Sequence, residues 1–530
     1  MRADERYRSI PNMLRQNAAR FADREAVVDG DNRLTSRELA DRALEATRAL
    51  MAAGVEPGDR VSIWAPNCVE FVVAALGILG AAAWLVPINT RFKGDEAAYV
   101  LRKSGARMLF TVGDFLGIDS VELLRRADPA TAASCRTVIL SGAPKPGIEG
   151  FADLLVGADA VSEDDALARL DAIEGDDVAD IMFTSGTTGR PKGVLLTHGQ
   201  SLRAFESWGA GFGLREGDRD LIVPPFFHCF GYKAGWMLCL MTGATALPVA
   251  IFEPGEALRV IERERVTVVT GPPTLWSAML DHAHRQATDL SSLRIAYVGA
   301  ATVPETLIRR MLAELPVEHV STGYGLTEAT AMCSITKPGD APDTISAWNG
   351  GTPVEDIEVR IVDEAGNDVD VGTPGELLIR GYNVMRGYYD DPEATAEVIG
   401  SDGWLHTGDI AVANDDGYFR IVDRKKDIYI TGGFNVSPAE VEGLLLHDER
   451  ISEIAVIGIP DERMGEVGAA FVVPQPGASL GPEDVIAFAR EHVANYKVPH
   501  RVVLVDALPL NASGKVLKTV LRERVQLGNE

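Results

Sequence analysis

Lysine is scarce in this chain, with eleven lysines against forty arginines among 530 residues. Positive charge is scarce overall, because 77 acidic residues outnumber 51 lysines and arginines and leave a formal net charge of −26. A surface of that sign repels phosphate backbones and anionic lipid, which argues against a protein that binds nucleic acid or membrane surfaces. An anionic ligand must therefore be held by a local group of backbone donors and a few cations.

Cysteine and long apolar runs are also scarce. The five cysteines are scattered, odd in number and form no CxxC pair, which excludes a disulfide scaffold and favours a reducing compartment. The charged N-terminus has no apolar segment behind it, so no secretory signal is expected. The longest apolar run, Phe71–Val86, has sixteen residues and is closed by Pro87, short of the roughly 20 that span a bilayer. We therefore expect a cytoplasmic protein without membrane insertion.

Apolar residues make up 46% of the chain and charged residues 24%, values typical of a globular protein. Its length predicts three or four folding units at roughly 150 residues each. Up to about residue 320, helical stretches alternate with short apolar runs, a pattern typical of layered parallel α/β structure. The strands expected there are Arg60–Trp64, Ala82–Val86, Arg107–Thr111, Thr137–Leu140, Ala179–Phe183, Leu221–Val223, Thr267–Val269 and Ile295–Val298.

From about residue 350 the pattern changes to short strands separated by turn residues, which predicts a small antiparallel β unit. A compact α+β unit follows, with a helix that starts where Ser437 as cap is followed by Pro438 and by Glu440. The strands expected in these two units are Glu358–Val362, Glu376–Ile379, Gly417–Val422, Glu453–Ile459, Ala470–Val473 and Arg501–Val505, with a further helix over 482–494.

The junction between these units is charged, from Asp423 through Arg424, Lys425 and Lys426 to Asp427. A charged segment without glycine or proline predicts a hinge rather than a loose linker, and the alternative is an exposed turn without a special role. We therefore predict an N-terminal domain over residues 1–423, with a β-rich subdomain from about 350, and a C-terminal domain over residues 424–530.

The densest signal for function is the segment Thr184–Gly193, which reads TSGTTGRPKG and follows an expected strand. Its glycines let backbone N–H groups converge on an anion, while its hydroxyls and Lys192 add donors and a charge. A Walker A loop has four residues between its first glycine and a Gly-Lys pair. This segment lacks that spacing, so it is not a Walker A loop. The segment therefore predicts a phosphate-binding loop, and the alternative is an ordinary polar surface loop.

Three further glycine-bearing segments carry candidate ligands. In Ser321–Ala329, Tyr324 offers an aromatic face for a purine and Glu328 is the hard oxygen ligand that Mg²⁺ prefers. Asp409 can accept hydrogen bonds from two vicinal hydroxyls, and Lys515 follows a glycine from which it can swing toward an anionic group. Taken singly, these segments are also compatible with a helix-capping turn, a β-turn with a structural Asp, and surface decoration.

At these four segments the sequence resembles the adenylate-forming superfamily, which includes acyl-CoA synthetases, 4-coumarate-CoA ligases, luciferases and the adenylation domains of peptide synthetases. The likeness covers nearly the whole chain and keeps the order of the motifs. It implies an α/β fold with a large N-terminal domain of layered α/β subdomains, a small β-barrel-like subdomain and a small mobile α+β C-terminal domain. It also implies ATP- and Mg²⁺-dependent ligation of a carboxylic acid to CoA through an acyl-adenylate.

The resemblance further implies a role for each matching residue. Lys515 would bridge the substrate carboxylate and the α-phosphate, Thr184 and Glu328 would serve the magnesium, and His228 would gate the acyl pocket. Lys426 would be the hinge, and Gly433 would belong to the glycine loop used in thioester formation. The residues implied to bind ATP or CoA are Ser185, Gly186, Thr187, Thr188, Gly189, Lys192, Tyr324, Gly325, Thr327, Asp409, Arg424, Lys426 and Gly433.

The substrate is less defined than the reaction. The segments His228–Gly235, Gly299–Pro304 and Asp427–Val436 look like one actinobacterial branch that activates the indane-dione propanoate left from steroid rings C and D. In that branch, Tyr232 or Lys233 could meet ring ketones. The alternatives are a medium- or long-chain fatty acyl-CoA synthetase, an acyl-AMP ligase that loads a separate carrier protein, and a catalytically silent nucleotide-binding relative. Expected partners are a small acid, ATP and CoA, without nucleic acid, and a homodimer stays open.

Overall fold

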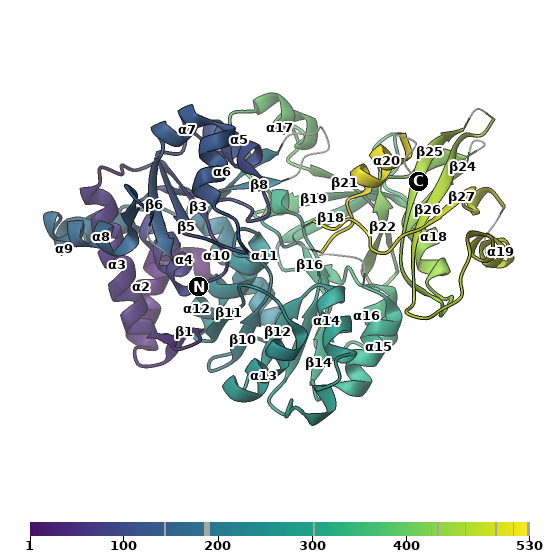
Figure 1. The fold of residues 1–530 in the computed structure, drawn as a ribbon, viewed down its shortest axis with the longest axis horizontal. Coiled ribbons are helices and arrows are strands. Elements are labelled where there is room, and N and C mark those ends of the chain that lie inside the picture. Colours follow the sequence, from purple (N-terminus) through teal and green to yellow (C-terminus); the bar gives the residue numbers. More distant parts are fainter. Residues whose placement is uncertain are drawn as a thin grey trace. The chain divides into compact units, whose positions relative to one another are not determined.

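The computed structural model describes residues 1–142, 145–184, 191–299, 303–425, 427–431, 434–461, 463–492, 495–511 and 514–526 (Figure 1). The chain divides into two compact units. The larger contains Met1–Ile345, Gly351–Glu358 and Arg380–Leu405, and the smaller contains Ser346–Gly350, Val359–Ile379 and His406–Glu530. The domain boundary that we placed between residues 423 and 424 stays a prediction.

One sheet of the larger unit has the strand order β20–β9–β8–β4–β3–β5–β6–β7. Neighbours among β3 to β6 run parallel, as the alternation of helices and apolar runs predicts, whereas β8 and β9 form an antiparallel pair. Its strands are β3 (Arg60–Trp64), β4 (Trp84–Pro87), β5 (Met108–Val112), β6 (Arg136–Ser141), β7 (Glu149–Gly150), β8 (Val178–Thr184), β9 (Lys192–Thr197) and β20 (Gly387–Tyr388).

A second sheet of this unit has the order β14–β13–β12–β10–β11–β1–β2, in which β10 to β14 run parallel. Its strands are β1 (Glu25–Asp29), β2 (Asn32–Thr35), β10 (Arg219–Ile222), β11 (Thr245–Pro248), β12 (Val268–Gly271), β13 (Ile295–Val298) and β14 (His319–Ser321). A small sheet has the order β15 (Gly323–Tyr324), β16 (Ser334–Ile335) and β17 (Thr352–Pro353).

Helices cover these sheets; α13, α14 and α15, for example, lie beside the strands of the second sheet (Figure 1). The helices of this unit are α1 (Ala3–Tyr7), α2 (Ile10–Arg20), α3 (Ser36–Ala52), α4 (Val69–Gly80), α5 (Gly94–Ser104), α6 (Ser120–Ala127), α7 (Pro129–Ser134), α8 (Phe151–Val156), α9 (Glu163–Asp171), α10 (His198–Phe212), α11 (Cys229–Gly231), α12 (Leu238–Thr242), α13 (Pro254–Glu264), α14 (Pro273–Leu280), α15 (Glu305–Glu314) and α17 (Pro392–Val398). Helix α16 (Pro342–Ala347) straddles the boundary of the two units.

The longest apolar run is a buried helix joined to a buried strand. Residues Phe71–Val86 supply most of α4, a turn and the start of β4, and α4 packs on α3. A Cβ atom at Gly77 would lie 2.6 Å from the Cβ of Ala46, so the glycine lets the two helices approach closely. The run is therefore apolar because it lies in the core, as its length predicts.

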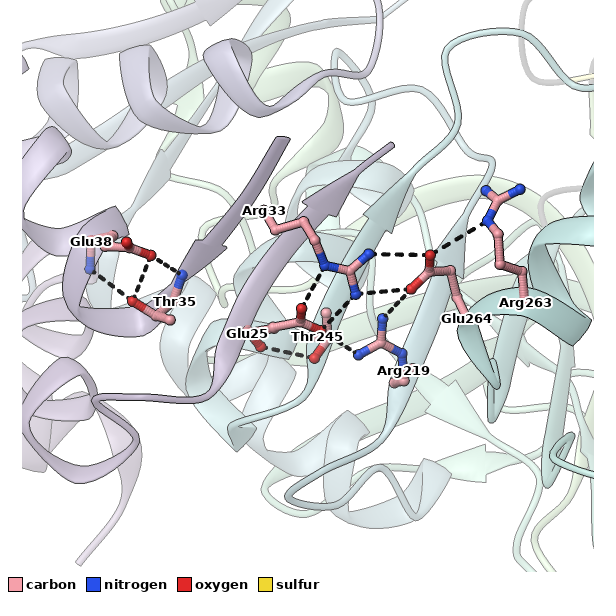
Figure 2. A network of polar contacts seen from close by, with 8 residues as sticks. All are labelled: Glu25, Arg33, Thr35, Glu38, Arg219, Thr245, Arg263 and Glu264. Atoms are coloured by element: carbon pink, nitrogen blue, oxygen red, sulfur yellow. Dashed lines mark hydrogen bonds and ion pairs between the residues drawn. The ribbon is translucent and has the colours of Figure 1, made fainter. Parts of the chain in front are cut away.

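The sequence pattern did not predict the N-terminal hairpin of β1 and β2, which extends the second sheet. A network of ion pairs fastens this edge (Figure 2). Arg33 contacts Glu25 at 2.6 Å and Glu264 at 3.0 Å, and Arg219 contacts the same two carboxylates at 2.7 and 2.8 Å. Hydrogen bonds from Arg33 lower the pKa of both glutamates. Paired charges along β2 also make this edge a poor template for another strand.

The smaller unit contains the β-rich segment and the α+β segment that the sequence predicts. The first forms a sheet of order β18 (Ile357–Val362), β19 (Gly375–Gly381), β21 (Leu405–Ala413) and β22 (Phe419–Arg424), in which β21 and β22 are antiparallel. The second forms a sheet of order β24 (Phe434–Val436), β23 (Tyr429–Thr431), β26 (Gly465–Pro474) and β25 (Ile451–Asp461), with β27 (Arg501–Leu504) parallel to β26.

Helices α18 (Pro438–Leu445) and α19 (Pro482–His492) lie beside the sheet of the α+β segment (Figure 1). Helix α20 (Lys518–Gln526) follows β27 in the chain. The predicted start of α18 is confirmed, because Ser437 Oγ accepts a hydrogen bond from the Glu440 N–H at 3.2 Å. Val441 and Leu445 of α18 and Val485 of α19 pack with the strands in one core. That apolar face holds the α+β segment together.

Candidate active site

The predicted phosphate-binding loop leaves one strand and enters the next. Strand β8 ends at Thr184 and β9 begins at Lys192, and the two residues are paired opposite each other across the antiparallel ladder. The backbone pairing of β8 and β9 therefore fixes both ends of the loop. The loop residues Ser185, Gly186, Thr187, Thr188, Gly189 and Arg190 lie outside the described residues.

Glu328 lies beside Thr184, where β8 ends. Its carboxylate Oε1 accepts a hydrogen bond from Thr184 Oγ1 at 3.4 Å and one from the Tyr388 hydroxyl at 3.0 Å. Glu328 belongs to a short helical turn, Thr327–Ala329, and its carbonyl accepts a hydrogen bond from the Met385 N–H at 2.8 Å. The structure thus brings together the two residues predicted to serve the magnesium.

The turn that carries Glu328 is strongly braced. Thr330 and Ala331, which follow it, have φ values of 53° and 60°, a left-handed conformation that non-glycine residues adopt only under restraint. Thr330 Oγ1 donates to the Asn383 carbonyl at 2.6 Å, and the Asn383 amide donates to the Met332 carbonyl at 2.6 Å. These bonds to the buried Asn383 supply the restraint, so the carboxylate of Glu328 projects from a fixed backbone.

Tyr388 is a site residue that the sequence reasoning missed. Its hydroxyl donates to Glu328, and the Nζ of Lys192 lies 4.9 Å from the centre of its ring. Burial and the neighbouring charge of Glu328 raise the pKa of Tyr388, so its hydroxyl stays protonated and keeps donating. The only signal in the sequence is a Gly-Tyr pair among turn residues, which is too common to mark a site.

The segment expected to meet the adenine is built around two close backbone approaches. Tyr324 is half-buried on strand β15, and Thr327 is half-buried at the start of the helical turn. A Cβ at Gly325 would lie 2.1 Å from the Ala331 carbonyl oxygen, and one at Gly323 would lie 2.5 Å from that of Ser334. Only glycine fits at either position, which explains the glycines on both sides of Tyr324.

His228, the expected gate, caps the short helix α11. Its Nδ1 accepts a hydrogen bond from the Phe230 N–H at 3.1 Å, so the neutral imidazole carries its proton on Nε2. Burial lowers the pKa of His228 to about 4, so the ring is neutral at physiological pH. His228 is therefore an uncharged hydrogen-bond donor. Phe230, whose N–H donates to that imidazole, belongs to a group of aromatic rings in which Tyr297 lies 5.6 Å from Phe230 and 5.0 Å from Trp208 between ring centres.

The expectation that Tyr232 or Lys233 meets ring ketones of a substrate finds no support in this structure. Both side chains are fully buried: Tyr232 stacks on Trp236 with ring centres 4.7 Å apart, and Lys233 Nζ lies 2.9 Å from Asp180. The acyl-pocket wall expected at Val298–Thr302 is described only as far as Gly299.

In the smaller unit, the two residues expected to hold the ribose face each other. Asp409 and Arg424 are paired across β21 and β22, and the Nε of Arg424 lies 3.0 Å from Oδ1 of Asp409. Asp409 is only 3% exposed, whereas the arginine is partly exposed. The arginine thus orients the buried carboxylate of Asp409.

Lys515 lies on a turn that Asn511 closes. The Asn511 N–H donates to the Lys515 carbonyl at 2.7 Å, and the Lys515 N–H donates to the Asn511 side chain at 2.8 Å. Helix α20 begins three residues later and is held by two ion pairs, Lys518–Glu442 at 2.9 Å and Arg522–Asp427 at 2.8 Å. The backbone on both sides of Lys515 is therefore anchored within its own unit.

Two remaining predictions lie outside the described residues, namely Lys426 as hinge and Gly433 of the glycine loop. The loop joins β23 to β24, which form an antiparallel hairpin with Thr431 opposite Phe434.

The oxygen donors near the phosphate loop fit magnesium. Glu328 offers a carboxylate and Thr184 a hydroxyl, which are hard ligands, and Mg²⁺ is commonly held by one or two carboxylates together with substrate phosphates and water. No cluster of three or more His, Cys, Asp or Glu side chains suited to a metal occurs in the described ranges. The donor set therefore suits a magnesium that arrives with a nucleotide rather than one caged by protein.

Comparison with known proteins agrees with this arrangement. Residues 14–389 match the AMP-binding enzyme family, and residues 440–515 match the AMP-binding enzyme C-terminal domain. The chain belongs to the AMP-binding enzyme family.

Two relatives of this family member carry the name 3-[(3aS,4S,7aS)-7a-methyl-1,5-dioxo-octahydro-1H-inden-4-yl]propanoyl:CoA ligase. The one from Rhodococcus jostii is 47% identical over 524 residues, which cover 98% of this chain and 99% of the relative. The one from Mycobacterium tuberculosis is 49% identical over 516 residues, which cover 97% and 99%.

A solved structure of the anthranilate CoA ligase AuaEII with anthranoyl-AMP is similar over 100% of this chain and 99% of that chain, with a TM-score of 0.89 and 27% identity. The o-succinylbenzoate CoA synthetase MenE from Bacillus subtilis with its acyl-adenylate has a TM-score of 0.82 and 28% identity over 97% and 98%. These likenesses confirm the predicted fold class.

The enzyme is therefore an AMP-forming acid-CoA ligase that uses ATP, Mg²⁺ and CoA, as its sequence predicts. Its substrates are small molecules, a carboxylic acid among them. Every helix in the described ranges is too short or too polar to cross a lipid bilayer.

Proposed function

We propose that this ligase activates the propanoate side chain of a 7a-methyl-1,5-dioxo-octahydroindene, the steroid-derived acid named for its two relatives. The observation that carries the proposal is the 47% and 49% identity with those relatives over nearly the full length of all three chains. The partly exposed ring of Phe230, two residues after His228, supports it, because a fused ring system offers a broad apolar face to an aromatic ring.

In this proposal, the residues of the site position and neutralise rather than attack. Thr184 and Glu328 hold the magnesium with the ATP phosphates, the Thr184–Gly193 loop and Lys192 bind those phosphates, and Lys515 neutralises charge as the carboxylate oxygen approaches the α-phosphorus. No covalent nucleophile is needed, because in-line attack requires alignment and charge compensation. The neutral His228 donor stands at the acid and carries no positive charge that would compete with Lys515.

The nucleotide and the C-terminal domain have further proposed roles. Tyr324 with Gly325 receives the adenine, Thr327 contacts phosphate, and Asp409 with Arg424 holds the ribose. The C-terminal domain turns at Lys426 and presents the loop at Gly433 for attack by the CoA thiol, so that one enzyme catalyses two reactions in sequence. We further propose action in the cytoplasm, which fits the five free cysteines, and a homodimer, which mass photometry tests directly.

A substrate panel tests the proposed acid. Purified protein with ATP, Mg²⁺ and CoA is offered the indane-dione propanoate, octanoate, palmitate and ferulate, and pyrophosphate and CoA thioester are measured. The proposal expects kcat/KM for the dione acid to exceed that for the other acids by at least about 100-fold, near the discrimination that the shape of an apolar pocket gives. Higher efficiency with palmitate or octanoate refutes this substrate, and pyrophosphate without thioester points to a carrier protein instead.

A further inference from the structure

A charged pair lies wholly inside the larger unit. The Nζ of Lys233 lies 2.9 Å from Oδ2 of Asp180, and neither side chain has any exposed surface. The same Nζ donates a hydrogen bond to Ser201 Oγ, also fully buried, at 2.7 Å. The roles proposed above use none of these three side chains. A buried lysine is unfavourable unless it is paired and hydrogen-bonded, so its partners define its position closely.

The groups around this pair leave it as a couple of opposite charges. Burial and the charge of Lys233 lower the pKa of His198 to about 3, so that imidazole is neutral, and its Nδ1 accepts a hydrogen bond from the Ile10 N–H at 3.3 Å. Tyr232 lies next to Asp180, and burial keeps its hydroxyl protonated by raising its pKa. Burial raises the pKa of Asp180, and the neighbouring Lys233 opposes that rise, so each side chain is the charge partner of the other in an environment without water-exposed atoms.

The partners of Lys233 come from β8, which leads into the phosphate loop, and from α10, the helix that follows β9. Asp180 lies on β8 four residues before Thr184, and because side chains alternate along a strand, the two residues share one face. Ser201 lies in the first turns of α10, which begins directly after β9. Lys233 is therefore fixed to the strand that enters the loop and to the helix that follows the next strand.

Lys233 itself belongs to the segment that carries the gate. It follows His228 by five residues and lies in a π-helical turn, Tyr232–Met237, in which Gly235 departs from helical geometry with φ −93° and ψ −108°. A Cβ at Gly231 would lie 2.2 Å from the Pro224 carbonyl oxygen, so the segment is wound tightly at this point. π-Helical turns are less favourable than α-helix and need tertiary contacts to persist.

We infer that Lys233, with Asp180 and Ser201, is a positioning residue that holds the acyl-gate segment in register with the phosphate loop. The inference rests on the functions proposed for His228 and for the Thr184–Gly193 loop. Paired charges in a low dielectric have a strong dependence on distance and direction, so they set the relative position of two elements more sharply than apolar contacts do. The carboxylate of the acid and the α-phosphate of ATP then meet in a fixed alignment.

The test removes both charges together. In Lys233→Met/Asp180→Asn, no charge is left unpaired, and melting temperature reports whether the fold persists. Pyrophosphate exchange is measured with whichever acid the unchanged enzyme activates best, normalised to active sites by the pyrophosphate burst. If Lys233 and Asp180 position the gate segment, the double variant should have an acid KM at least fivefold higher and a kcat about tenfold lower than the unchanged enzyme. Its KM for ATP should stay within twofold. A purely structural role predicts fewer active sites with both KM values unchanged.

A matched control is available in another buried ion pair of the same unit, Arg294 with Asp218, which directly precede β13 and β10. Arg294→Met/Asp218→Asn is expected to leave kcat per active site and both KM values within twofold of the unchanged enzyme. A higher acid KM and a lower kcat in this control overturn the inference. An unchanged acid KM and kcat in the Lys233→Met/Asp180→Asn enzyme overturn it as well.

A milder variant decides the question if the double variant fails to fold. Ser201→Ala removes one hydroxyl and leaves the ion pair, and positioning predicts an acid KM about threefold higher with the ATP KM unchanged. An unchanged acid KM in this folded variant overturns the inference. A wrong substrate assignment gives a different result, because it lowers the activity of the unchanged enzyme with that acid and leaves the comparison of variants intact.

Discussion

The hydroxyl of Thr184 lies 3.4 Å from the carboxylate of Glu328, although the two residues are 144 positions apart in the chain. Strand β8 delivers the first and a braced helical turn delivers the second. The Tyr388 hydroxyl reaches the same carboxylate oxygen at 3.0 Å. The carboxylate is thus held by two neutral donors, which orient it without neutralising its charge.

Tyr388→Phe should therefore weaken adenylation without removing a proposed ligand. A hydrogen bond to a charged group contributes roughly 1.5–3 kcal/mol, so loss of this donor predicts a fall in kcat/KM of at least about tenfold. Pyrophosphate exchange over a range of Mg²⁺ concentrations measures it, and the midpoint of the Mg²⁺ titration should shift. Tyr389→Phe is the control, because its ring packs on Trp84, and its activity should stay within twofold. An unchanged Mg²⁺ titration in the Tyr388 variant would falsify the orienting role.

Lys515→Ala should separate the two halves of the reaction. Loss of the charge that compensates the approach of the carboxylate predicts a fall in pyrophosphate exchange of at least about 100-fold. Thioester formation from a synthetic acyl-adenylate should stay within a fewfold, because that step starts after the phosphorus has been attacked.

Lys497→Ala is the control in the same unit, since Lys497 is paired with Glu440 at the start of α18. Its two half-reactions should both remain close to those of the unchanged enzyme. Equal losses of both half-reactions in the Lys515 variant contradict the proposed role.

Asp220→Asn should change the dependence of stability on pH. Burial raises the pKa of Asp220 to about 8, whereas an unfolded chain ionises near 3.9. Between those values the folded state keeps a proton that the unfolded state has lost, so this group makes the enzyme less stable as pH rises from about 4 to 8. Asparagine carries no such titration, so the stability of the variant relative to the unchanged enzyme should rise steadily as pH rises from about 4 to 8.

Thermal melts of both proteins between pH 5 and 8 measure this difference. Asp218→Asn is the control of opposite sign, because it leaves the buried Arg294 without its carboxylate and should lower the melting temperature throughout. A difference between Asp220→Asn and the unchanged enzyme that does not grow with pH would refute the prediction.

Local signals made the regular elements predictable. Arg60–Trp64 and Ile295–Val298 are strands with the predicted bounds, and Ser437 caps the predicted helix, because short apolar runs and capping residues act through near neighbours in sequence. The hairpin of β1 and β2 was missed, since its place in the sheet depends on a parallel pairing of Val27 with Ala246. A contact over that separation leaves no local pattern.

The sequence by itself determined the family and the reaction, because glycines, hydroxyls and a lysine in fixed order form a local pattern of chemistry. Only the tertiary structure decided that Tyr388 orients Glu328 and that Lys233 faces Asp180. Each of these residues alone reads as an ordinary turn tyrosine, or as a polar residue inside an apolar run. Their roles depend on partners that sheet pairing and burial bring close. In the low dielectric of the interior, the energy of each charge depends strongly on its neighbour.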